Sequence, residues 1–182
     1  MITETPAKAR KTVGGVRRLD ARLDAVVAPG AVIEVLAEGF VWSEGPVWVK
    51  DGGYLLFSDV PANIMHRWSE ADGASVFLQP SGYDGPPTAG FREPGSNGLA
   101  LDAAGALLVC DHGNRAISKV DLRTRRKTIL LDRFEGKRFS SPNDLAVARS
   151  GGIYFTDPPY GLEGLNDSPL KETTFNLSLI HI

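Results

Sequence analysis

The segment EGPVW, at Glu44–Trp48, is the strongest indication of the fold, because altered copies of it occur twice further along the chain. The second copy is NGLAL at Asn97–Leu101, and the third is NDLAV at Asn143–Val147. Each copy opens with an oxygen-bearing polar side chain and continues with apolar residues. An aspartate follows fourteen or fifteen residues after each opening residue: Asp59, Asp111 and Asp157. A unit whose starts lie 53 and then 46 residues apart indicates a repeat protein.

The rest of each repeat has the pattern of short strands joined by turns. A turn rich in Asp and Gly follows the opening strand, and these residues suit tight corners. Second strands are expected at Tyr54–Asp59, Ala106–Asp111 and Ile153–Asp157. Third strands are expected at Ile64–Trp68 and Ile117–Val120, and fourth strands at Ser75–Gln79 and Thr128–Asp132. Four strands per unit without helical periodicity predict an all-β fold, a β-propeller with blades that start near residues 44, 97 and 143.

Composition limits the class of protein. The chain is 42% apolar and 23% charged with a net charge of −2, which favours neither nucleic acid nor a membrane surface as a partner. The single cysteine, Cys110, allows no internal disulfide and is expected to be a core residue. The chain has no run of eighteen apolar residues, and its start lacks the apolar stretch of a secretory signal. We therefore expect a cytoplasmic protein.

Three segments differ from the repeats. Residues 1–30 carry six basic side chains and are expected to form a flexible, solvated lead-in to a partial propeller at residues 31–176. Val32–Glu38 has the pattern of a strand, which we expect to complete the last blade of a closed ring. Ser81–Ser96 is rich in Gly and Pro, and we expect it to form a long loop near the functional site.

The carboxy-terminal end departs from the repeat pattern. The third repeat has two strands and a loop, and the chain then ends in LSLIHI at Leu177–Ile182. This ending resembles a translated sequencing adapter, so residues 177–182 are expected to be a non-native tail. Three blades cannot close a ring, and an open ring leaves sheet edges and apolar faces exposed. We therefore expect an amino-terminal fragment that is poorly soluble and inactive, from a native chain that runs on for roughly as long again.

Five motifs in order carry a family resemblance. They are EGPVW, SNGLALD, CDHGNR, SPNDLAV and FTDPPYGLEG. From Val32 to Asn176 the chain resembles the family of senescence marker protein, gluconolactonase and luciferin-regenerating enzyme. This resemblance implies a propeller of six blades when complete, and a hydrolase with a divalent cation in its central channel.

The resemblance also implies roles for single residues. Glu44 matches the glutamate that binds the cation, and Asn143 matches a ligand asparagine. Asn97 matches an asparagine that binds the metal or orients the substrate. The aspartate that completes the ligand set in the family, and that is also proposed as its general base, lies beyond the end of this chain. Gly95 stands where some members have a substrate-binding arginine, and Arg92 is the candidate to replace that arginine.

Other side chains leave two interpretations open. Tyr160 would either form a wall of the substrate pocket or pack structurally. His112 would either be an acid or base in the pocket or a structural histidine. The recurrence of Asp59, Asp111 and Asp157 favours a structural role in the blade turns.

The predicted ligands also agree with each other chemically. One carboxylate and two amide carbonyls are hard oxygen donors, which suit Ca²⁺ best, with Mg²⁺ or Mn²⁺ as alternatives, and no cluster of His or Cys points to zinc. Such a cation polarises an ester carbonyl. We therefore expect a lactonase of the gluconolactonase type that acts on a small-molecule lactone. Phosphotriester hydrolysis at the same site and a non-catalytic metal-binding scaffold are the alternatives.

Overall fold

The computed structural model describes residues 10–86, 90–174 and 179–181, and the chain divides into two units, Met1–Gly39 and Phe40–Ile182. In the first unit, Ala21–Ala25 forms a short 3₁₀ helix (η1), and a single antiparallel bridge joins Thr12 to Glu34. The strand expected at Val32–Glu38 is therefore present only as this one bridge. Its partner, Thr12, belongs to the basic lead-in. The second unit begins at Phe40, and the bounds of the propeller at residues 31–176 stay a prediction.

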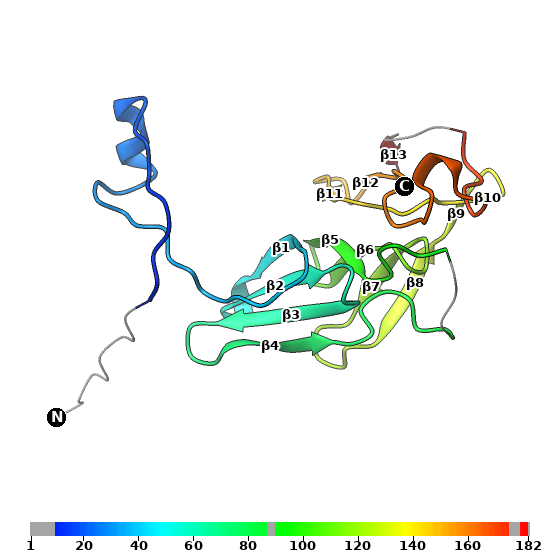
Figure 1. The fold of residues 1–182 in the computed structure, drawn as a ribbon, viewed down its shortest axis with the longest axis horizontal. Coiled ribbons are helices and arrows are strands. Elements are labelled where there is room, and N and C mark those ends of the chain that lie inside the picture. The colour runs from blue at the N-terminus through cyan, green and yellow to red at the C-terminus, as the bar shows by residue number, and fades with distance from the viewer. Residues whose placement is uncertain (1–9, 87–89, 175–178, 182) are drawn as a thin grey trace. The chain divides into compact units, whose positions relative to one another are not determined.

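The second unit consists of antiparallel sheets whose strand order follows the sequence (Figure 1). The first sheet contains β1 (Ser43–Val49), β2 (Tyr54–Asp59), β3 (Ile64–Ser69) and β4 (Gly73–Leu78). The second contains β5 (Ser96–Leu101), β6 (Leu107–Asp111), β7 (Ala116–Val120) and β8 (Lys127–Leu131). The third contains β11 (Leu145–Val147), β12 (Ile153–Thr156) and β13 (Leu179–His181). Smaller elements are the hairpin of β9 (Arg133–Phe134) and β10 (Lys137–Arg138) and the 3₁₀ turns η2 (Lys50–Gly52) and η3 (Leu165–Asp167).

This architecture confirms the predicted β-propeller with three blades in this chain. Every strand expected within the three repeats is present, with ends that differ by at most two residues. The first strands of the blades are neighbours, because β5 packs against β1 on one side and β11 on the other. The six-bladed closed ring stays a prediction. The predicted tail at residues 177–182 lies partly outside the described residues, and Leu179–His181 pairs with β12.

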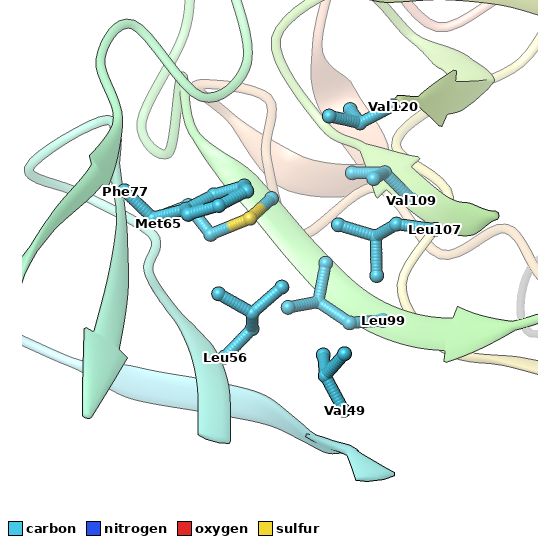
Figure 2. Close-up of a cluster of buried hydrophobic side chains, with 8 residues drawn as sticks. All are labelled: Val49, Leu56, Met65, Phe77, Leu99, Leu107, Val109 and Val120. Atoms are coloured by element: carbon cyan, nitrogen blue, oxygen red, sulfur yellow. The ribbon is translucent and has the colours of Figure 1, made fainter. Parts of the chain in front are cut away.

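The main core lies between the first and second blades. Figure 2 shows its eight buried side chains pointing toward one another from both sheets: Val49, Leu56, Met65, Phe77, Leu99, Leu107, Val109 and Val120. Full burial of such a side chain contributes about 1.5–3 kcal/mol, so this cluster is the main attachment between the blades. A second cluster joins the second blade to the third: Cys110, Ile117, Phe139 and Phe155.

Cys110 is fully buried in the second cluster, which confirms the expected core role. Burial raises the pKa of its thiol well above the ordinary value. Among residues 10–86, 90–174 and 179–181, no helical segment has the length and apolar character needed to cross a lipid bilayer.

Candidate functional site

Glu44, Asn97 and Asn143 line one hollow where the inner ends of the three blades meet. The hollow has a volume of about 200 Å³, and its wall is completed by Gly45, Pro46, Leu99 and Asp144. A second hollow of about 300 Å³ shares the same three side chains and is also lined by Trp42, Arg92, Glu93 and Tyr160. The structure thus brings together all five residues predicted as metal ligands or substrate contacts. Their individual roles stay predictions.

Glycines allow the inner strands to come this close. A Cβ atom at Gly45 would lie 2.3 Å from the backbone oxygen of Asn97, and Gly45 also has a φ of +54°. A Cβ atom at Gly98 would lie 2.7 Å from the backbone oxygen of Asn143. The Gly98 N–H instead donates to that oxygen at 2.8 Å. The residue after each of the first two predicted ligands is therefore a glycine because the next blade occupies the space of a side chain.

Hydrogen bonds to their backbones and between their side chains hold Asn97 and Asn143 in position. The Ser58 hydroxyl of β2 donates to the backbone oxygen of Asn97 at 2.8 Å, across the boundary between the first two blades. The N–H of Asn143 donates to the Thr156 oxygen at 2.8 Å. The Asn97 side-chain Nδ2 then donates to Asn143 Oδ1 at 3.0 Å. The amides of two blades are thus directly joined at the hollow.

Two lining residues, Trp42 and Glu93, were missed by the sequence reasoning. The Trp42 indole N–H donates to Glu44 Oε1 at 2.9 Å, so it orients the predicted ligand carboxylate. Glu93 lies beside Arg92 in the loop between β4 and β5. The sequence offered one clue to both residues, their closeness to predicted site residues: Trp42 precedes Glu44 by two residues, and Glu93 follows Arg92 directly. The positions of Arg92 and Glu93 confirm that the Gly- and Pro-rich loop reaches the site, although residues 87–89 lie outside the described residues.

The segment after β12 supports this loop from behind. The Gly161 oxygen accepts hydrogen bonds from the N–H of Arg92 at 3.0 Å and of Glu93 at 3.3 Å. The Gly161 N–H donates to the Ser141 hydroxyl at 2.9 Å. Tyr160, which precedes Gly161, is 42% exposed and lines the larger hollow, so its position supports the pocket-wall interpretation.

The recurring aspartates have the predicted structural role. Asp59 accepts hydrogen bonds from the backbone N–H groups of Val41 and Trp42, both at 3.0 Å. Asp157 does the same for Ser140 and Ser141, at 2.8 and 2.9 Å. Each carboxylate therefore ties the entry of its blade to the end of the second strand.

Asp111 of the second blade does not make this pair of backbone contacts. One of the two positions equivalent to Val41 and Trp42 is Pro94, which has no N–H. Asp111 instead accepts hydrogen bonds from Asn114 and Ser118 and pairs with Lys127 at 2.9 Å.

Burial raises the pKa of Asp157 to about 6, although its two backbone donors oppose the shift.

His112 is fully buried behind the hollow. Its Nε2 lies 3.2 Å from Asn97 Nδ2, and its Nδ1 lies 3.4 Å from Glu93 Oε2. The imidazole is not part of the wall of either hollow described above, so the structural interpretation of His112 is favoured over that of a pocket acid or base.

Comparison with known proteins finds gluconolactonases among the proteins similar to this chain. A gluconolactonase of Zymomonas mobilis subsp. mobilis is 52% identical over 166 residues, which cover 91% of this chain and 47% of that protein. The solved structure of XC5397 from Xanthomonas campestris, a gluconolactonase, matches with a TM-score of 0.78 at 32% identity and covers 98% of this chain and 57% of the other. The chain thus spans about half the length of the relatives that it matches.

The family described as SMP-30/Gluconolactonase/LRE-like matches residues 42–176, a range that includes every predicted site residue. Because this range covers most of the sequence, the chain belongs to the SMP-30/gluconolactonase/LRE-like family.

Proposed function

We propose that this chain is part of a lactonase that depends on a divalent cation. The observation that carries the proposal is the convergence of Glu44, Asn97 and Asn143, one from the start of each blade, on a single hollow. Their carboxylate and amide oxygens form the hard donor set that Ca²⁺ prefers, with Mg²⁺ or Mn²⁺ as alternatives. The residues present therefore fit such a cation. When bound, it would polarise the carbonyl of the substrate.

The residues of the larger hollow support a small polar substrate. The Arg92 side chain is 52% exposed, and its Nη2 lies 3.5 Å from Glu93 Oε1. The other N–H groups of the guanidinium can donate to hydroxyl or carboxylate oxygens of a sugar-acid lactone. Trp42 and Tyr160 present partly exposed aromatic surfaces to the same space. In this proposal Arg92 takes the role of the substrate-binding arginine that some family members have at the position of Gly95. The aromatic side chains limit the size of the substrate.

The chain's own carboxylates have other partners at the hollow. Glu44 accepts from Trp42, Glu93 lies against His112, and Asp144 accepts from the backbone N–H of Leu145. The family resemblance implies that the general base comes from a later blade. A base of this kind contributes on the order of 10²–10⁴-fold to hydrolysis. The cytoplasmic location remains part of the prediction.

The test measures hydrolysis of D-glucono-1,5-lactone by the full-length protein, meaning this chain together with any sequence that continues it in its gene. We expect activity that is lost with EDTA and restored by Ca²⁺. Glu44→Gln should lower kcat/KM by more than about 100-fold, because loss of a mere outer partner of a metal ligand already costs about 10–100-fold. Glu135→Gln, which removes an exposed charge in the turn between β9 and β10, is the control and should keep full activity.

Other outcomes separate the alternatives. Turnover of a phosphotriester with no turnover of lactones would favour the phosphotriesterase-like enzyme. A rise in melting temperature with Ca²⁺, but no turnover of either substrate, would favour the non-catalytic scaffold. No effect of any divalent cation on stability or activity would refute the proposal.

A further inference from the structure

A chain of polar side chains runs along the wall of the hollow from Glu93 through the buried His112 and Asn97 to Asn143. The first separation, Glu93 Oε2 to His112 Nδ1, is 3.4 Å. His112 Nε2 and Asn97 Nδ2 are 3.2 Å apart, and Asn97 Nδ2 donates to Asn143 Oδ1 at 3.0 Å. Four segments contribute to this chain: the loop before β5, β5 itself, the residue after β6 and the entry to β11.

The Asn97 amide can face the hollow with either end, and the two ends have opposite chemistry. Its oxygen binds cations and accepts protons, whereas its nitrogen donates. In the structure the nitrogen faces inward, where its two hydrogens are directed at Asn143 Oδ1 and His112 Nε2. The oxygen is then the end left for the hollow. A reversed amide would place its oxygen against Asn143 Oδ1, which is also an acceptor.

The tautomer of His112 decides whether this orientation is stable. In a neutral imidazole one nitrogen carries a proton and the other accepts a hydrogen bond. Asn97 Nδ2 only donates, so it can bond to His112 Nε2 only when Nε2 is unprotonated. The carboxylate of Glu93 only accepts, and it therefore favours the proton on Nδ1. His112 Nδ1 is buried and has no hydrogen-bond partner of good geometry among the described residues, which leaves Glu93 as the acceptor nearest to it.

The ring also has no room to turn away. A Cβ atom at Gly161 would lie 3.0 Å from His112 Nδ1 and 2.9 Å from the Ser141 Cβ, so the backbone after β12 packs directly on the imidazole. Glu93 is held in the same way, because its N–H donates to the Gly161 oxygen at 3.3 Å. Gly161 thus packs against the imidazole and holds the backbone of the residue whose carboxylate faces it.

We propose that Glu93 and His112 are positioning residues: Glu93 keeps the His112 proton on Nδ1, and His112 in turn holds the Asn97 amide with its oxygen toward the hollow. This inference rests on the proposed function in one respect, that the Asn97 oxygen binds a cation there. It adds two residues that act on the predicted ligand Asn97 and are not themselves predicted to bind the cation. Outer partners that orient metal ligands typically change affinity by about 10–100-fold.

The first experiment needs no cation. Nitrogen-15 NMR of histidine-labelled, metal-free full-length protein reports which ring nitrogen carries the proton, and His66 serves as the internal comparison. We expect the Nδ1–H tautomer for His112, and a loss of that preference in Glu93→Gln, whose amide both donates and accepts. An Nε2–H tautomer in the unaltered protein would overturn the proposal whether or not the protein binds a cation.

The second experiment uses Ca²⁺ calorimetry. His112→Leu removes the acceptor for Asn97 and should weaken Ca²⁺ binding by about 10–100-fold. His112→Gln places an amide oxygen near the position of Nε2 and should restore most of that affinity. His66→Leu removes a histidine that stacks on Phe57 in the first blade and should leave Ca²⁺ affinity unchanged.

The outcomes separate the two proposals. If His112→Leu and His112→Gln both lower the melting temperature but leave the affinity of the folded protein unchanged, His112 is merely structural and the inference is wrong. If the unaltered protein shows the expected tautomer but binds no divalent cation, the proposed function fails while the orientation of Asn97 stands.

Discussion

Replacement of Gly45 by alanine is the sharpest test of how the blades hold the site. Gly45 has a φ of +54°, and an added Cβ atom would lie 2.3 Å from the Asn97 oxygen and 2.8 Å from the Gly98 Cα. Both are backbone atoms, so neither can rotate away. The first blade must therefore move relative to the second, or the strand that carries Glu44 must distort.

The expected cost has two parts. A left-handed backbone costs an alanine about 1–2 kcal/mol. Insertion of a methyl group into a packed region adds typically about 1–3 kcal/mol. Gly53 separates these parts, because it has a similar φ of +62° but no atom of the described residues within 4 Å of its added Cβ. Gly53→Ala should thus show only the first cost, and Gly45→Ala should show both.

The assay is urea unfolding of the full-length protein with EDTA present, so that cation binding does not contribute to stability. We expect Gly45→Ala to lose roughly 1–3 kcal/mol more than Gly53→Ala. In a parallel titration Gly45→Ala should also bind Ca²⁺ more weakly, because the displacement separates Glu44 from Asn97. Equal losses of stability in the two variants would refute the reasoning that close approach of the inner strands requires this glycine.

Three further predictions follow from particular contacts. Burial raises the pKa of Asp157 from 3.8 to about 6, so its ionised form is disfavoured in the folded protein; stability from this residue is full below pH 3.8 and lost as the pH rises through 6. The difference is about 3 kcal/mol, and Asp157→Asn should flatten the dependence of melting temperature on pH between 4 and 7; an unchanged slope would contradict the assignment. Ser58→Ala leaves the buried Asn97 oxygen without its donor and should cost about 1–3 kcal/mol together with Ca²⁺ affinity. The control Ser69→Ala removes a contact to Asp72 in an outer turn and should cost stability alone, so an equal loss of affinity in both variants would argue against a role for Ser58 at the site. Cys110 should resist an aromatic disulfide reagent in the native protein and react only on unfolding, because burial raises its pKa; rapid labelling of native protein would show that the second core cluster opens.

The blades were predictable because their interactions are local in sequence. Each strand pairs with the next one along the chain, and the turns between them contain residues such as Asp51 and Gly53 that favour reversal of direction. Strand ends shifted by only a residue or two for this reason. Val32–Glu38 had an equally good strand pattern, but a strand also needs a partner, and its partner at Thr12 comes from a segment with no strand signal.

Part of the site was predictable for a different reason. Glu44, Asn97 and Asn143 hold the same position in successive repeats, and rotation about a common axis brings equivalent positions together. Trp42 and Glu93 are not related by the repeat. Their places at the hollow depend on an indole that folds back on Glu44 and on a loop held by Gly161, and neither contact leaves a periodic signal.

The amino-acid order by itself determined that this protein is a succession of four-stranded units with one polar oxygen at the head of each, since strand pairing and turn formation act over short distances along the chain. The orientation that we propose for the Asn97 amide, by contrast, could be inferred only from contacts made in the folded protein. That orientation depends on His112, Glu93 and Asn143, which lie on separate elements and meet only after the blades have packed together.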